Sequence, residues 1–466
     1  MPHNEHKIPH KDNIRAKDRF RLPPKLLQHI ALFIRDTSVF FTYLEAFHQD
    51  DGILGNLQHL WTLSMVVFRH DRLWPTLHIR PVNIFPYKEL YIPILAYYST
   101  VHVLDVFDLA FLQQASTSTT IAMSGFPQEE DMTTPLDDWY RTLPALRISD
   151  VTWCNPAINS GIQHLLTTLP RMPHVRSLNL ARAIVPSITS LVDFVASSQL
   201  TSINFSGIHE SPWRDAVASS AMDARLTSWL QREPVTHVAL GHWDLRSAPN
   251  FIAALWQRNT LKQLVLTCGK IPPLDAVPFG ATPLTTSHVD IGASRQRPVD
   301  VLALARGIAH SPRLVFLSLM CNHVGPAQEL MHAIVHSNVC ELNLAGCDLG
   351  DTGCVVVAKC LHETKLTTLD LGSNDITIVG ALELASAIIA TPQLGVFSLR
   401  YNHIQTSGVV AVIQAFGGHS RQAKLDVYQY SVSDDKYMDD LPAVASRFPQ
   451  LNVVFAGDMD DVDFPS

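Results

Sequence analysis

The segment Leu366–Ile376, LTTLDLGSNDI, decides how this chain folds. Three further segments follow the same pattern, L-x-x-L-x-L-x-x-N/C-x-L, and they are LVFLSLMCNHV from Leu314, VCELNLAGCDL from Val339 and LGVFSLRYNHI from Leu394. Successive copies start 25, 27 and 28 residues apart, counted along the sequence. Such a period indicates stacked supersecondary units, each of which packs only on its neighbours. A chain of 466 residues can therefore fold without one very large core.

Each copy of the pattern predicts a short strand followed by a turn. The x-L-x-L-x centre alternates, which is typical of a strand that buries every second side chain. A polar side chain buried where the chain leaves the strand can satisfy backbone groups that the turn leaves unpaired. We expect this role for Asn322, Cys347, Asn374 and Asn402.

A helix is predicted after each turn. The stretches GDTGCVVVAKCLHETK from Gly350 and TIVGALELASAIIATPQ from Thr377 carry apolar residues at helical spacing. Glycine recurs near the start of these helices, where it permits a close backbone approach. The glycines concerned are Gly353, Gly380 and Gly408.

Weaker copies extend the array in both directions, to about a dozen repeats in all. Downstream, one copy places apolar residues at Leu425, Val427, Tyr430 and Val432, and a terminal unit starts at Leu451. Upstream copies start at Leu261, Val235, Leu200 and Val175, and looser ones at Leu143 and Val101.

Two stretches interrupt the period. Residues 113–144 are polar, and residues 272–298 are rich in proline and glycine. Both are predicted to be surface loops, because irregular backbone buried in a core leaves polar groups unpaired. A degraded repeat is expected within the second stretch, around residues 288–291.

The repeat unit resembles the ribonuclease-inhibitor class of leucine-rich repeats, strongly over residues 314–432 and more loosely over 175–271. The resemblance implies an α/β solenoid, a horseshoe of alternating strand and helix with a concave parallel sheet and convex helices. It also implies that partners bind the concave face or its rim. We expect this domain to span residues 75–455.

A helical segment precedes the array. Residues 1–21 are polar and mildly basic, and are expected to form a flexible leader. Proline at position 24 is tolerated in a first helical turn, and apolar residues then recur at helical spacing. A second helix is expected through Phe40, Phe41, Leu44 and Phe47, and a third through Leu57, Leu60 and Leu63.

Residues 22–74 resemble an F-box, a three-helix module that docks onto the adaptor subunit of cullin–RING ubiquitin ligases. Leu22-Pro23, Leu26-Leu27, Ile30 and the closing Leu73-Trp74 carry the resemblance, whereas Lys25 replaces the acidic residue usual in the family. The resemblance implies that the chain is a non-catalytic substrate-recognition subunit whose repeats bind a protein substrate. The adaptor-binding residues it implies are Leu22, Pro23, Leu26, Leu27, Ile30 and Ile34.

An alternative is that this segment only caps the solenoid, because a terminal repeat needs a shield for its open apolar face. An exposed apolar stripe on the first helix would favour docking, and a fully packed stripe would favour the cap.

Composition narrows the remaining functions. Charged residues are 17% and the net charge is -8, so no basic face for nucleic acid is expected. The seven cysteines lack paired short spacings, which favours reduced thiols. No apolar run is long enough for a membrane span, and the polar start does not read as a secretory signal. We therefore expect a protein of the cytoplasm or nucleus.

No catalytic motif is found, and neither a cofactor nor a metal is expected. The seven-residue spacing of Cys340, Cys347, Cys354 and Cys360 suits small buried side chains better than zinc ligands. The end of the sequence, residues 456–466, is an acidic tail. The GTPase-activating protein for Ran has the same repeat class and an acidic tract, so a regulator of that kind is a further alternative.

The x positions of adjacent repeats become neighbours on the uncovered face of the sheet. Aromatic residues and arginine are enriched in binding hot spots. Arg400, Tyr401 and Tyr428 form one expected cluster, and Phe316 and Met320 form a second. The complete set of expected substrate-binding residues is Phe316, Met320, Asp370, Arg400, Tyr401, Asp426 and Tyr428.

Overall fold

The chain forms two compact units. Unit 1 comprises Met1–Ser124 and Ala145–Ile148, and unit 2 comprises Gly125–Pro144 and Ser149–Ser466. The computed structural model describes residues 22–50, 52–81, 86–114, 118–154, 160–211, 215–279, 284–325, 327–419, 421–428 and 440–455. The expected leader, the acidic tail, Tyr430 and Val432 therefore lie outside the described residues.

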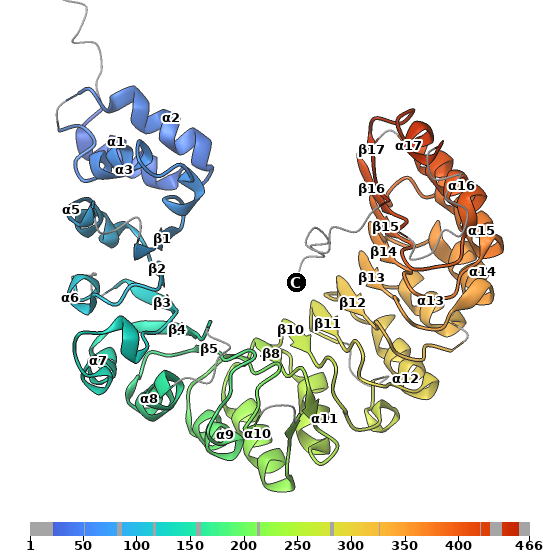
Figure 1. Cartoon of the computed structure of the whole chain (residues 1–466), viewed down its shortest axis with the longest axis horizontal. Helices are drawn as coiled ribbons and strands as arrows, with labels where there is room; N and C mark the ends of the chain where they lie inside the picture. The colour runs from blue at the N-terminus through green and yellow to red at the C-terminus, as the bar shows by residue number, and fades with distance from the viewer. Residues whose placement is uncertain are drawn as a thin grey trace, which may run out of the picture. The chain divides into compact units, whose positions relative to one another are not determined.

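Unit 1 begins with the three expected helices, α1 (Pro24–Phe33), α2 (Thr37–Phe47) and α3 (Leu57–Ser64) (Figure 1). Pro24 occupies the first turn of α1, and the Asp36 side chain caps α2 by accepting from the Val39 N–H. The elements that follow are η1 (His70–Arg72), β1 (Leu77–Ile79), α5 (Lys88–Tyr91), η2 (Ile92–Tyr97), β2 (Thr100–Leu104), α6 (Leu109–Leu112) and β3 (Thr120–Ser124).

The helices of unit 1 share a core with its first strands. Phe40 of α2 stacks on Trp74 with ring centroids 4.3 Å apart, and the Trp74 indole N–H donates to the Ile34 carbonyl. Trp74 also meets the Tyr98 ring edge-on at 5.7 Å. Strands β1, β2 and β3 pair in parallel, so repeat geometry starts directly after the helices.

Unit 2 is a parallel sheet with one helix or turn between most successive strands. Its strands, in spatial order, are β4 (Ile148–Thr152), β5 (Ser177–Asn179), β6 (Ser202–Asn204), β8 (His237–Ala239), β10 (Gln263–Val265), β11 (His288–Asp290), β12 (Phe316–Ser318), β13 (Glu341–Asn343), β14 (Thr368–Asp370), β15 (Val396–Ser398), β16 (Ala423–Asp426) and β17 (Leu451–Val454). A small separate pair joins β7 (Ala216–Val217) to β9 (Trp243–Asp244).

The helices of unit 2 all lie on one side of this sheet, as Figure 1 shows, and the other side is the uncovered face. The helical elements are η3 (Glu129–Asp131), α7 (Leu136–Thr142), η4 (Leu143–Ala145), α8 (Ser160–Thr168), η5 (Leu169–Arg171), α9 (Ile188–Ser197), α10 (Ser220–Arg232), α11 (Pro249–Gln257), η6 (Leu274–Ala276), α12 (Pro298–Ile308), α13 (Gln328–Val335), α14 (Gly350–Leu361), α15 (Ile378–Ile389), α16 (Gln405–Gly417) and α17 (Asp440–Ala445).

The strand register confirms the alternation read from the sequence. In the three-residue strands of unit 2, which are β5, β6, β8 and β10 to β15, the middle residue aligns with the middle residue of the next strand, and each of these side chains is at most 1% exposed. In the best-preserved repeats this buried row is Leu317, Leu342, Leu369, Phe397 and Leu425.

Buried asparagines join successive repeats, as expected from their place after the strand. The Asn402 side-chain oxygen accepts from the N–H groups of Asn374 and Ile376, at 2.9 and 3.0 Å, and its amide donates to the Leu371 and Leu399 carbonyls. Asn374 and Asn322 bond their own preceding repeats in the same way. We call these three side chains, with Cys347, the asparagine ladder. Cys347 is included because its thiol donates to the Leu319 carbonyl at 3.2 Å.

The glycine prediction is confirmed at the tightest contacts. A Cβ on Gly380 would lie 2.6 Å from the Asp351 Oδ1 atom and 2.8 Å from the Ile376 Cγ2 atom. A Cβ on Gly353 would lie 2.7 Å from the Leu349 Cβ atom. Gly408 is less constrained, since the nearest atom would be 3.2 Å away.

The prediction that residues 113–144 form only a loop is wrong. They contain β3, η3 and α7, and Leu136, Trp139 and Tyr140 of α7 are buried. These apolar residues fill one short helix between polar stretches, which hid the helix from a pattern search. In the second stretch the degraded repeat is confirmed, because β11 pairs with both β10 and β12.

Candidate functional site

An apolar stripe on α1 is the candidate docking surface of unit 1. Leu22, Leu26 and Ile30 are 47%, 44% and 37% exposed, and Phe33 extends the stripe at 83%. Leu27 and Ala31 occupy the opposite side of α1 and are buried. Helical spacing therefore separates a face that packs from an apolar face that meets solvent.

The six predicted adaptor-binding residues divide between these two faces. Leu22, Pro23, Leu26 and Ile30 are exposed, and Ile34 is half-buried. Leu27 is only 7% exposed and faces the core, so the prediction that Leu27 lies on the docking surface is wrong. The Tyr43 hydroxyl donates to the Leu27 carbonyl, and the two helices are tied together at this point.

Three further exposed apolar residues follow α3 and were not singled out from the sequence. Met65, Val66 and Phe68 are 69%, 39% and 101% exposed. The run MVVF reads as the end of an apolar helix, so nothing in its pattern distinguishes it from core. They add three exposed apolar side chains to those that precede and lie on α1.

On the uncovered face of unit 2, a polar side chain caps the backbone that leaves the strand in six of the repeats. The Asp370 Oδ1 atom accepts from the Gly372 N–H at 2.8 Å, and Asn343 accepts from the Ala345 N–H at 3.0 Å. The same bond recurs in other repeats, with acceptors Asn179, Asn204, Asp290 and Asp426.

Asp370 and Asp426 therefore stabilise the fold through these backbone hydrogen bonds, although they were predicted to lie on the substrate-binding surface. They are 0% and 5% exposed. Burial raises the pKa of Asp370, against the lowering effects of the Gly372 N–H and the Arg400 guanidinium. Burial also raises the pKa of Asp290, although hydrogen bonds from the Gly292 N–H and the Ser318 side chain lower it. Neither Asp370 nor Asp426 presents a carboxylate that a partner can reach directly.

Arg400, Tyr401 and Tyr428 do come together, but they follow the strands instead of lying within them. The two tyrosine rings meet edge-on with centroids 5.3 Å apart, and the Arg400 guanidinium lies 5.9 Å from the Tyr401 ring centre. An Arg400 nitrogen is 3.7 Å from the Asp370 Oδ2 atom. We call Arg400, Tyr401 and Tyr428 the strand-end cluster.

Tyr401 owes its position to an unusual backbone conformation. Its φ is 58°, in the left-handed region that favours glycine, and its N–H donates to the Tyr428 carbonyl. The residue at this slot is left-handed in several repeats, including Arg182, His242, Cys268, Cys321 and Ser373. The sequence pattern carries no mark of this conformation, because the slot is occupied by many residue types.

Phe316, the first residue of β12, and Met320, two residues after its end, are both half-buried. Phe316 stacks on His288 of the adjacent strand with ring centroids 5.9 Å apart. Further along, burial lowers the pKa of His237, with the nearby Lys262 and His288 acting in the same direction. The Phe316–His288 pair gives this part of the uncovered face an aromatic character.

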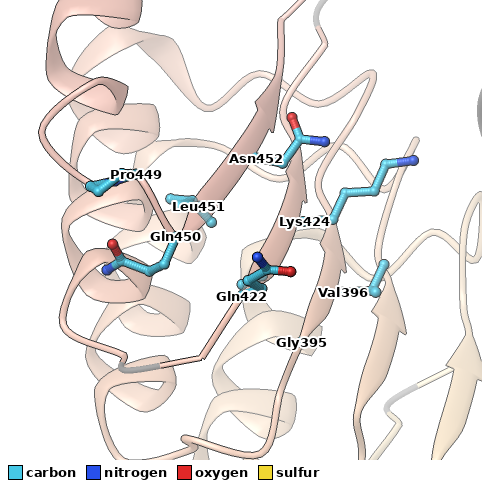
Figure 2. Close-up of a pocket in the computed structure, with 9 residues that line it drawn as sticks. Gly395, Val396, Gln422, Lys424, Pro449, Gln450, Leu451 and Asn452 are labelled. Atoms are coloured by element: carbon cyan, nitrogen blue, oxygen red, sulfur yellow. The ribbon is translucent and has the colours of Figure 1, made fainter.

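An open cavity of about 590 Å³ lies at the starts of β15, β16 and β17. Figure 2 shows Lys424 and Asn452 side by side on β16 and β17, and Gln450 on the turn before β17. Lys424 is the one charged side chain among the described residues that line it. The cavity was not predicted, because its residues converge only through the parallel register.

The described residues give little support to other kinds of site. Within the ranges given above, no group of three or more His, Cys, Asp and Glu side chains is placed to hold a metal ion. Burial raises the pKa of both Cys347 and Cys354 to about 12, so these thiols stay protonated. None of the helices that the structure describes is long and apolar enough to cross a bilayer.

The chain contains leucine-rich repeats. A model of the Leucine Rich repeat family matches residues 336–358 and 362–385, which carry β13, β14 and most of α14 and α15. The register and the asparagine ladder of unit 2 are those of such a repeat.

Two known proteins are similar to parts of the chain. Human "NACHT, LRR and PYD domains-containing protein 14" is 31% identical over 91 residues, which is 19% of this chain and 8% of that protein. The chain thus spans less than a tenth of that relative. The solved leucine-rich repeat-containing protein LegL7 from Legionella pneumophila is 19% identical, with a TM-score of 0.37 over 63% of this chain and 87% of that one.

Proposed function

We propose that this chain is a protein-binding subunit that connects a substrate, held by the repeats of unit 2, to a ubiquitin ligase. Unit 1 would dock onto the adaptor subunit of a cullin–RING ligase. The protein would contribute no catalytic residue, and would act by raising the effective concentration of substrate near the conjugating enzyme.

The exposed stripe of Leu22, Leu26, Ile30 and Phe33 is the observation that carries this proposal. Apolar side chains of a terminal cap should be turned into the solenoid, because covering apolar surface is what a cap is for. Here they face solvent from Leu22, two residues before α1, to Phe33 at its end. Burying four such side chains against a partner would contribute several kcal/mol to binding, at about 25 cal/mol per Å².

A pull-down with purified adaptor subunit tests the docking step. We expect the full chain to retain the adaptor, and the double variant L26E/I30E to reduce retention at least tenfold, because two carboxylates would be desolvated at the interface. Leu382→Glu on α15 is the matched control, since Leu382 is 47% exposed in unit 2 and should leave retention unchanged. Full retention by the double variant, or none by the unmodified chain, contradicts the proposal.

The second candidate is a binding scaffold with no ligase link. The stacking of Phe40 on Trp74 and of Trp74 against Tyr98 favours it, because the helices and the first strands of unit 1 share one core. Under this alternative the chain captures a protein partner through unit 2, and adaptor retention is absent in every variant.

Substrate binding is proposed for the strand-end cluster, Phe316 and Met320. Tyr428→Ala and Phe316→Ala should each weaken capture of a co-purifying protein by about tenfold while changing the melting temperature little, because both side chains are half-buried. Arg400→Ala is a poor test, since it would leave the buried Asp370 carboxylate without its cation. Capture unchanged in the Phe316→Ala/Tyr428→Ala double variant would place the substrate elsewhere.

A further inference from the structure

Helix α13 places two histidines one turn apart on its exposed side. His332 lies in the last turn of the helix, and His336 is the residue at its C-terminal cap. Both side chains are exposed. Residues four apart lie one above the other on a helix, and side chains tilt toward its N-terminus, so the His336 ring leans over the turn that carries His332.

The two imidazole rings are already in contact. Their centroids are 4.6 Å apart, and the ring planes are inclined by 82°. Within the part of the chain that the structure describes, neither ring forms a hydrogen bond or an ion pair. The ring nitrogens of both histidines are therefore open to a ligand from solvent.

Two histidines at this spacing on one helix face are the arrangement that binds zinc in H-E-x-x-H helices. Zinc lies about 2.0–2.1 Å from an imidazole nitrogen, so two nitrogens that share one ion are at most about 4 Å apart. Ring nitrogens lie off the centroid, and rotation of the two side chains can bring one nitrogen of each ring into that range. The described residues place no third His, Cys, Asp or Glu side chain in the group, so water would take the other coordination positions.

The charge of α13 favours a dication at this end of the helix. The C-terminal end of a helix carries a partial negative charge, which stabilises cations within the last turn. The helix, QELMHAIV, contains neither lysine nor arginine. Glu329 is exposed and precedes His332 by three residues, so its carboxylate lies on the same face of the helix. A metal ion at the two imidazoles would therefore meet negative charge and no cation of α13 itself.

We propose that His332 and His336 bind a divalent transition-metal ion, with zinc as the cation that fits this ligand pair. One nitrogen of each ring would coordinate the ion, and imidazole ligands suit zinc, nickel and copper. The bound ion would hold the last turn of α13 closed, because both ligands must stay in helical register to share it. This site lies on the helical side of unit 2, and it is separate from both surfaces in the proposed function (Figure 1).

The first experiment locates the ion in the unmodified full chain by amide exchange and mass spectrometry. An opening of α13 that separates the two rings must release the ion. With Ni²⁺ at ten times its dissociation constant, exchange in α13 should therefore slow at least threefold, and up to about tenfold by linkage. Zn²⁺ should slow α13 in the same way. Mg²⁺, which prefers oxygen ligands, is the control ion and should have no effect, and exchange in α9 should stay unchanged with all three ions.

The second experiment alters the ligands and uses isothermal titration with Ni²⁺. Nickel is the probe because zinc also binds thiolates, and Cys268 and Cys321 are exposed. His332→Gln and His336→Gln should each weaken one Ni²⁺ site at least tenfold, because loss of either ring turns a two-point contact into a single one. His310→Gln, at an exposed position two residues after α12, is the matched control and should leave that site unchanged.

Exchange in α13 that is equal with and without Ni²⁺ would overturn the proposal, since any nickel taken up would then lie elsewhere in the chain. Equal slowing by Mg²⁺ would exclude imidazole as the ligand. The proposal also fails if both single variants bind Ni²⁺ as tightly as the unmodified chain. The variants replace exposed side chains, so their melting by circular dichroism should match that of the unmodified chain, and the exchange experiment decides the outcome without them.

Discussion

Asn402 shows how one side chain can join two repeats. Its oxygen accepts two N–H groups of the preceding repeat, and its amide donates to carbonyls on both repeats. The side chain is 5% exposed, so its removal takes these partners away from backbone groups that are themselves buried. The asparagine ladder therefore makes the stability of each repeat depend on its neighbour.

Replacing Asn402 should lower the free energy of unfolding in proportion to the hydrogen-bond donors and acceptors that are removed. We expect Asn402→Ala to lower the free energy of unfolding by about 3 kcal/mol, because several buried backbone groups lose their partners. Asn402→Cys should cost roughly half as much, since Cys347 occupies the equivalent slot and donates from its thiol. Urea denaturation measures both values. An alanine variant as stable as the cysteine variant would show that the ladder bonds contribute little.

At the scale of the element, the N-terminus of helix α15 is capped by a carboxylate from the previous repeat. Asp351 of α14 accepts from the Thr377 and Gly380 N–H groups, each at 2.9 Å, and from the Thr377 hydroxyl at 2.6 Å. Burial alone would raise the pKa of Asp351, but these hydrogen bonds lower it below its ordinary value of 3.8. The ionised carboxylate is thus the form that the folded state prefers.

The stability contributed by Asp351 should depend on pH in a definite direction. A carboxyl group whose folded pKa is lowered stabilises the protein above its unfolded pKa, and that contribution is lost as pH falls through the folded pKa. Asp351→Ala should lower the free energy of unfolding by about 1–2 kcal/mol at pH 7, as for lost helix caps. The difference should shrink below about pH 4.

Denaturation at pH 7 and pH 3.5 measures this effect. Glu363→Ala, at an exposed position two residues after α14, is the control and should change stability little at either pH. A penalty for Asp351→Ala that does not vary with pH would mean that the carboxylate charge has no part in capping α15.

The elements that repeat along the sequence could be predicted from it, whereas elements held in place by tertiary contacts could not. The strands at Leu317, Leu342 and Leu369 follow from alternation alone, because each buries its own leucine. Helix α7 was missed, since its short apolar set is surrounded by polar residues. Elements are predictable where their periodicity is long, and unpredictable where one or two turns are held by tertiary contacts.

The candidate surfaces show the same division. The exposed stripe on α1 could be predicted from helical spacing, although Leu27 falls on the buried side. The burial of Asp370 and Asp426 could not, because it depends on the backbone bonds that these side chains make after their strands. The cavity at Lys424 depends on the register of three strands, which no single segment specifies.

At the scale of the whole array, unit 2 should respond to damage locally. Each strand pairs only with its two neighbours, so the free energy of the array is close to a sum of repeat and interface contributions. Leu425→Ala removes a fully buried side chain of β16. We expect faster amide exchange in β15, β16 and β17, by a factor of at least ten, and unchanged exchange in β5 and β6.

Ile203→Ala in β6 is the reciprocal variant, since Ile203 is 1% exposed. It should loosen β5, β6 and β8 and leave β16 unaffected. Hydrogen exchange followed by mass spectrometry resolves these segments. Exchange that rises throughout unit 2 in either variant would indicate one cooperative unit in place of a chain of coupled repeats.

The left-handed residue after each strand has a consequence for engineering. Gly207 and Gly346 occupy this slot in two repeats, whereas Tyr401 and its counterparts hold side chains there at a conformational cost of roughly 1–2 kcal/mol. Replacement by glycine at such a slot removes the side chain and relieves the backbone at once. These repeats therefore each have one position after the strand at which the side chain can be changed without altering the buried core.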